Sequence, residues 1–239
     1  MSATLTLTSA SSDLVGYLGD WIYGDPVTGH GSFYPAASPY DQWAGGNTSA
    51  SVILDGDFTY VQGNLQGTVD TLDFGTGLSG SSSTGFSLGT TELSIDLDSA
   101  GPIASFDSAI YGLMAGSLTN LYAYFAEVGT TQIGTSGDDV LYSFAGDDTL
   151  TGGGDSDTFN FNLDVNGAAT VGDDVITDFA VTDELIVFGL DSSYDSYAEI
   201  IAATTDTGAG ALIDLGAYGS ITLAGVQVAD LTTDNFAFV

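Results

Sequence analysis

The sequence predicts a first half of mixed α and β structure and a second half that is all β. In the first half, apolar residues at helical spacing occur together with alternating segments rich in β-formers between glycine turns. In the second half, glycine and aspartate recur at a nine-residue period, which is typical of short stacked strands joined by turns. We place the boundary at the polar, glycine-rich stretch 133–137 and expect domains over 1–130 and 131–239.

The charged residues are of one sign. Among 239 residues, Lys and Arg number 0 and Asp and Glu number 32, so the formal net charge is −32. Nucleic acid and anionic membrane surfaces are therefore excluded as partners, because both bind through basic residues. Of the acids, 28 are Asp, the short carboxylate that turns and calcium loops use. A bound cation is the expected counter-charge.

Several classes of site and segment are excluded by what the sequence lacks. It has no cysteine, so a disulfide or thiolate site cannot form. Since no apolar stretch approaches about 18 residues, we expect no membrane insertion. The first residues, 1–7, have no basic region and no continuous apolar region, so we expect no cleaved signal peptide.

The elements expected in the first half begin with a short helix. Ser12 and Asp13 can cap it, and it should end before Gly24. Its apolar face holds Leu14, Leu18 and Trp21. Strands are predicted over 50–61, 65–73 and 91–97. Two helical stretches are predicted over 103–128, with a break near Gly116.

The second half opens with three units of nine residues. From Gly134 they read GTSGDDVLY, SFAGDDTLT and GGGDSDTFN. Aspartates 139, 148 and 157 take the sixth position, and the apolar residues 141, 150 and 159 take the eighth. A glycine turn supplies backbone carbonyls and a carboxylate, and the strand after it directs its apolar residue into a narrow core. Carboxylate and carbonyl oxygens are the ligands that Ca²⁺ prefers, so the units predict calcium sites between stacked turns.

These units resemble the RTX, or hemolysin-type, calcium-binding repeats, whose pattern is GGxGxDxUx. The resemblance implies a parallel β-roll in which units two apart share an ion. It pairs Asp139 with Asp157 at one site. Asp148 would need another partner, such as Asp173 or Asp174, at a second site. Asp155 stands where the pattern has glycine. The metal-site residues so implied are Gly134, Gly137, Asp139, Gly146, Asp148, Gly152, Asp155, Asp157, Asp173 and Asp174.

The last ten residues and the segment after the repeats extend this resemblance. Residues 172–179 and 183–187 are similar to the segment that follows RTX repeats in many proteins. Residues 230–239 look like the uncleaved C-terminal signal of type I secretion, an acid followed by a short apolar tail. The resemblance implies an extracellular protein with the type I secretion machinery as a partner.

The first half resembles the secreted hemophore family HasA. The similar strings are Gly16–Trp21, Gly31–Tyr34, Gly56–Tyr60, Val69–Gly75 and Ile110–Gly116. The resemblance implies an α+β fold, a curved antiparallel sheet backed by helices, with heme held at one edge between two loops. It assigns the iron ligands to Tyr60 and to His30, the single histidine of the chain. A second histidine that supports the tyrosine in the family has no counterpart, so weaker heme binding is expected.

Two functions fit these sequence features. The first is a secreted calcium-binding protein that binds heme through a hemophore-like domain. The alternative is a non-catalytic structural subunit of an extracellular filament, matrix or surface layer, which self-associates with calcium. An enzyme is not expected: the triplet Asp206–Gly208 occurs once, whereas aspartic proteases need two, and no GxSxG motif is present.

Overall fold

The computed structural model describes residues 2–24, 27, 31–61, 63–97, 104–163 and 169–239. By its contacts the chain divides into two compact units. The first unit comprises 1–11 and 15–128, and the second comprises 12–14 and 129–239. In the described part of the chain, no helix has the length and apolar character needed to cross a membrane.

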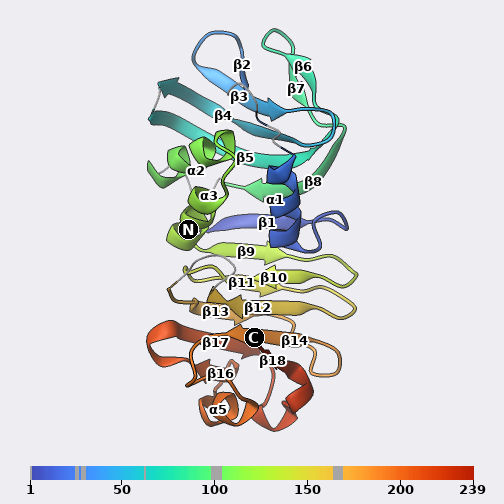
Figure 1. The fold of residues 1–239 in the computed structure, drawn as a ribbon, viewed down its shortest axis with the longest axis vertical. Coiled ribbons are helices and arrows are strands. Elements are labelled where there is room, and N and C mark those ends of the chain that lie inside the picture. The colour runs from blue at the N-terminus through green and yellow to red at the C-terminus, as the bar shows by residue number, and fades with distance from the viewer. Residues whose placement is uncertain (1, 25–26, 28–30, 62, 98–103, 164–168) are drawn as a thin grey trace. The chain divides into compact units, whose positions relative to one another are not determined.

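The first unit is built on an antiparallel sheet (Figure 1). Its strand order is β1 (Ala3–Leu7), β8 (Thr90–Asp96), β5 (Asn64–Thr76), β4 (Ser51–Val61), β3 (Tyr40–Gly46) and β2 (Ser32–Tyr34). A separate hairpin joins β6 (Ser79–Ser81) to β7 (Gly85–Ser87). The strands predicted over 50–61, 65–73 and 91–97 correspond to β4, β5 and β8 and are confirmed.

Helices cover the apolar face of this sheet. Helix α1 (Leu14–Tyr23) buries Leu14 and Leu18, as predicted, and ends before Gly24. Its Trp21 donates a hydrogen bond of 3.1 Å to the Ser51 carbonyl, and the Trp21 and Phe74 rings pack edge to face at 4.8 Å. The α+β first half, with an antiparallel sheet backed by helices, is thus confirmed.

Two further helices occupy the segment where two were expected. They are α2 (Ala104–Met114) and α3 (Thr119–Val128). Gly116 lies between them with φ of 73°, a left-handed conformation that glycine adopts without a steric penalty. The helix break therefore falls where the sequence predicted it.

In the second unit, the strands from β9 to β14 alternate between two sheets (Figure 1). One sheet pairs four strands in parallel: β9 (Thr130–Ile133), β11 (Thr149–Thr151), β13 (Gly172–Ile176) and β17 (Gly219–Ala224). The other sheet also pairs four in parallel: β10 (Val140–Tyr142), β12 (Thr158–Asn162), β14 (Leu185–Gly189) and β18 (Phe236–Phe238). Leu141, Leu150 and Phe159, the eighth residues of the three units, are fully buried in the core of this unit.

The expectation of an all-β second half is wrong in its last fifty residues. Helix α5 (Tyr197–Ala202) buries Ile200 in the core, and β16 (Gly210–Asp214) pairs antiparallel with both β17 and β15 (Thr204–Asp206). Short 3₁₀ helices lie at Gly216–Tyr218, Val228–Asp230 and Thr233–Asn235. The reason is local: Ser196 and Glu199, three residues apart, provide a helix-start signal that the nine-residue period does not contain.

Candidate metal centre and aromatic pocket

Asp139 and Asp157 lie side by side at one edge of the second unit. Each immediately precedes a strand, and the strands β10 and β12 pair in parallel with Val140 opposite Thr158. The Thr158 amide donates a hydrogen bond of 2.8 Å to the Asp139 carbonyl. The Asp139 amide in turn donates one of 2.9 Å to Oδ1 of Asp157. The two residues that the sequence paired are thus neighbours at adjacent strands, and the ion that they are expected to share stays a prediction.

Each of the two carboxylates presents one buried oxygen without a hydrogen-bond partner. Oδ2 of Asp139 accepts hydrogen bonds from the Thr135 amide, at 2.5 Å, and hydroxyl, at 2.9 Å. Oδ1 of Asp139 and Oδ2 of Asp157 accept none within the part of the chain that the structure describes, although both residues are only 1% exposed. A buried carboxylate oxygen without a partner carries a large desolvation penalty, which a hard cation can offset.

The glycines of these turns allow backbone and carboxylate oxygens to approach one another. A Cβ on Gly134 would lie 2.1 Å from the Gly152 carbonyl oxygen, and a Cβ on Gly152 would lie 2.2 Å from Oδ2 of Asp157. A Cβ at Gly134 would require the backbone to shift, and a Cβ at Gly152 would displace the Asp157 carboxylate. Asp155, at a glycine position of the pattern, has φ of 65° and so keeps the left-handed turn. The turn thus keeps backbone carbonyl and carboxylate oxygens, the donors that Ca²⁺ prefers, close to one another.

The electrostatic environment of this edge is one of unbalanced negative charge. Burial, together with the charges of Asp139, Asp178 and Asp138, raises the pKa of Asp157 to about 6. Within the described residues, no three acidic or histidine side chains converge as a metal cluster. Carbonyl oxygens would therefore supply much of the coordination, as they do in other calcium loops.

Asp148 and Asp174 form a second pair at the β11–β13 edge, where the sequence predicted Asp173 or Asp174 as partner. The Asp148 amide donates a hydrogen bond of 2.7 Å to Oδ1 of Asp174, whereas Asp173 is exposed. Burial raises the pKa of both Asp148 and Asp174. The negative charge of Asp148 raises the pKa of Asp174 further.

This second pair differs from the first in its hydrogen bonding. Both oxygens of Asp148 accept hydrogen bonds, from Thr130 and from the Phe144 amide. The second oxygen of Asp174 accepts one of 3.0 Å from the Ser143 hydroxyl. Since hydrogen bonds already satisfy these four oxygens, the calcium site predicted here stays a prediction. Gly146 approaches Gly172 closely at this edge, while Gly137 has an open Cβ position.

Three residues that were not predicted as site residues also lie at these two edges. Ser143 binds Asp174, as described above. Asp178 accepts hydrogen bonds from the Gly152 and Gly153 amides at 3.0 and 2.9 Å. Glu184 is 4% exposed and immediately precedes β14. Asp178 and Glu184 lie beyond the nine-residue repeats, although an acid directly before a buried apolar strand could have indicated Glu184.

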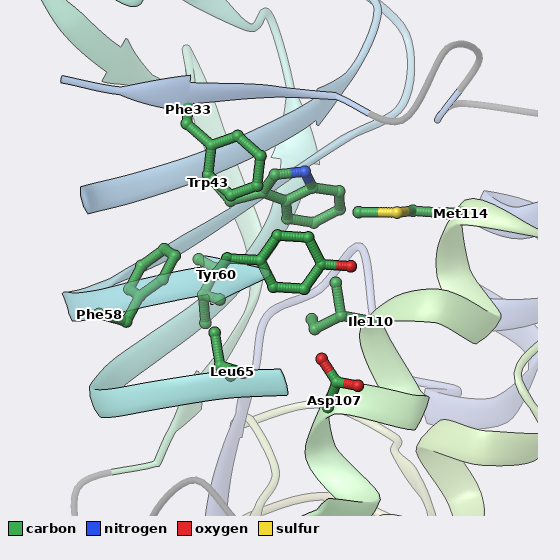
Figure 2. Close-up of a pocket in the computed structure, with 9 residues that line it drawn as sticks. Phe33, Trp43, Phe58, Tyr60, Leu65, Asp107, Ile110 and Met114 are labelled. Carbon is green, nitrogen blue, oxygen red and sulfur yellow. The ribbon is translucent and has the colours of Figure 1, made fainter. Parts of the chain in front are cut away.

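Tyr60 lines an aromatic pocket in the first unit, between strands β3 to β5 and helix α2 (Figure 2). Its ring stacks on Phe33 with centroids 5.6 Å apart, and its hydroxyl points toward the helix. The other lining residues are Trp43, Leu54, Phe58, Leu65, Asp107, Ile110 and Met114. The free space is about 10 Å³, room for one water molecule, so a larger ligand needs these side chains to move.

The chemistry of Tyr60 is that of a neutral phenol. Burial, the hydrogen bond and charge of Tyr111, and the charge of Asp107 all raise its pKa. A ligand tyrosinate therefore requires an iron centre strong enough to displace the proton. His30, the other predicted heme ligand, lies outside the described residues.

Comparisons with known proteins agree with both resemblances predicted from the sequence. Residues 133–159 match the family of RTX calcium-binding nonapeptide repeats. No curated protein matches the chain at a significant level. Similar solved structures include the apo hemophore HasA from Yersinia pestis, 21% identical with a TM-score of 0.45, which covers 56% of this chain and 98% of that one. The holo HasA from the same organism is 20% identical, with a TM-score of 0.43 and coverage of 56% and 100%.

Proposed function

We propose that this chain is an extracellular calcium-binding protein whose second unit is a parallel β-roll that completes its fold when calcium binds. The observation that carries the proposal is the pair of buried, unpartnered oxygens on Asp139 and Asp157, placed among close glycine carbonyls. The match of residues 133–159 to RTX calcium-binding repeats supports the same ion. The role is one of binding rather than catalysis.

The calcium dependence suits export before folding. Inside a cell, free calcium is far below the dissociation constants of about 10⁻⁴ to 10⁻³ M that are typical of extracellular modules, so the acidic turns repel one another. Outside, at millimolar calcium, the sites fill and folding follows. We propose a type I system as the export route, with residues 230–239 as its signal.

Far-UV circular dichroism of the full chain tests this function. With a chelator, we expect a weaker β signal. On addition of calcium to about millimolar free concentration, we expect a gain that magnesium does not reproduce. Asp139→Asn should require more calcium for the same gain. A β signal that calcium leaves unchanged would contradict the proposal.

Heme binding at the aromatic pocket is the second candidate function. It is favoured by the position of Tyr60, which lines an aromatic pocket and directs its hydroxyl toward α2. If the chain binds no heme, the remaining proposal is a structural subunit that self-associates through calcium. Hemin titration separates the two.

A further inference from the structure

Glu184 continues the column of acids that Asp139 and Asp157 begin. These three residues immediately precede β10, β12 and β14, which are neighbours in one parallel sheet. The Thr158 amide bonds the Asp139 carbonyl at 2.8 Å, and the Leu185 amide bonds the Asp157 carbonyl at 3.0 Å. The backbone step from the second acid to the third therefore repeats the step from the first to the second, although Glu184 lies outside the 133–159 repeats.

The side chain of Glu184 is also anchored like that of Asp139. The Asp139 carboxylate accepts a hydrogen bond from the amide four residues earlier, that of Thr135. The Glu184 carboxylate does the same with the amide of Ala180, at 2.6 Å. Segment 180–184 thus forms a turn equivalent to 135–139 but without its glycine, Gly137.

Oδ2 of Asp157 is the oxygen of this carboxylate that does not bind the Asp139 amide. Its other oxygen accepts the Asp139 amide, whereas Oδ2 is buried without a partner and packs against Gly152. The amides of Gly152 and Gly153 hold Asp178 beside it. Burial of Glu184, together with the charges of Asp157 and Asp178, raises its pKa to about 7. Asp178 and Glu184 thus add negative charge near the unpartnered oxygen of Asp157, in a chain without Lys or Arg.

We infer that a second calcium ion binds between Asp157 and Glu184, with Asp157 shared between this ion and the one at Asp139. The inference rests on the proposed calcium binding of the second unit. Oδ2 of Asp157 would be the ligand that both ions share, and turn carbonyls would complete the coordination. Because no three acids converge among the described residues, Asp178 or Glu184 would act through a bridging water, as some ligands of calcium loops do.

Calcium titration of the full chain against a chromophoric chelator tests the inference. Glu184→Gln removes a charge but keeps an oxygen for the Ala180 amide. Asp178→Asn removes a charge and keeps an oxygen for one of the two glycine amides, so the fold should persist. Each should weaken one ion about 10–100-fold, the usual effect of losing an outer or indirect ligand. Asp139→Asn should weaken a different ion, and Asp157→Asn should weaken both. Asp183→Asn, an exposed neighbour of Glu184, is the charge-matched control and should bind calcium like the wild type.

The outcomes separate this inference from the proposed function. If Asp139→Asn loses an ion while Glu184→Gln and Asp178→Asn match the Asp183→Asn control, the second site is wrong and calcium binding by the repeats stands. If Asp157→Asn loses no more than Asp139→Asn, the shared ligand is wrong. If the wild type binds no calcium, the proposed function fails as well. Circular dichroism at saturating calcium checks that each variant is folded.

Discussion

The backbone amide of Asp139 donates a 2.9 Å hydrogen bond to Oδ1 of Asp157, eighteen residues further along the chain. Two nine-residue units bring these residues into adjacent strands, so the side chain of one turn binds the backbone of another. The same relation joins Thr130 to Asp148 at 2.6 Å, and Asp148 to Asp174 at 2.7 Å. Carboxylates thus link neighbouring turns at both edges through hydrogen bonds that need no bound cation.

The first prediction concerns the ion at Asp139. Asp139→Asn and Asp157→Asn should both weaken it, and the double variant should bind no less calcium than Asp157→Asn alone, because the two residues serve one ion. Isothermal titration of the single and double variants measures this. If the losses of calcium affinity in the two single variants were additive in the double variant, the two carboxylates would serve different ions.

The second prediction concerns pH in the presence of a chelator. The pKa values of Asp148 and Asp174 are raised by burial in the folded state, so the folded chain holds more protons than the unfolded chain above about pH 4. Stability is therefore highest at acid pH and falls as pH rises through the raised values. We expect the melting temperature in chelator to be higher at pH 5 than at pH 8.

Asp174→Asn gives this pH prediction a sharper form. An amide cannot ionise, but it keeps an oxygen for the Asp148 amide, so at pH 8 in chelator the variant should melt higher than the wild type. We expect a gain of at least about 3 °C, since 1 kcal/mol corresponds to about 2–4 °C for a chain of this size. Thermal denaturation followed by circular dichroism measures it. A lower melting temperature, together with weaker calcium binding, would instead make Asp174 a calcium ligand.

The period of nine residues accounts for what the sequence could predict in the second unit. It identified Asp139, Asp157 and the buried apolar positions, because each repeats in residue type and spacing. Asp178 and Glu184 were not predicted as site residues. The turn that ends at Glu184 keeps the backbone path of the repeats but not the glycines of their pattern. Sequence periodicity detects a repeated side-chain pattern, whereas hydrogen bonding between neighbouring strands preserves the turn after the pattern has been lost.

In the first unit, the longer strands and the helices could be predicted because their apolar patterns are long. The strands β1, β2, β3, β6 and β7 were not predicted; β2, β6 and β7 have three residues each, and so short a segment has no periodicity to detect. The aromatic pocket could not be predicted as a cavity. Tyr60, Trp43 and Ile110 reach it from separate elements, and only the register of β3 with β4 and the packing of α2 bring them together.

The third prediction concerns the apolar tail proposed as the export signal. Strand β18 pairs with β14, and Phe236 is 7% exposed, with its ring stacked on Phe188 at 6.2 Å. Phe236→Ala should cost about 3 kcal/mol of stability, at the lower end for a buried phenylalanine. Deletion of 236–239 should in addition abolish export from cells with a type I system. Urea denaturation and a secretion assay measure the two effects. Val239→Ala, at a 76% exposed position, is the control, and normal export of the deletion variant would contradict the signal.

The last prediction decides whether the aromatic pocket binds heme. If it does, hemin titration of the wild type should give a Soret band, and Tyr60→Phe, which keeps the ring and removes the oxygen, should abolish the band or weaken binding strongly. His30→Ala should have the smaller effect. Tyr111→Phe is the matched control: Tyr111 raises the pKa of Tyr60, so its removal should favour the tyrosinate and leave binding equal or tighter. An unchanged band in Tyr60→Phe would exclude Tyr60 as the ligand. No band in the wild type would favour the structural subunit, because the pocket, with room for one water, would then be a packed aromatic core rather than a binding site.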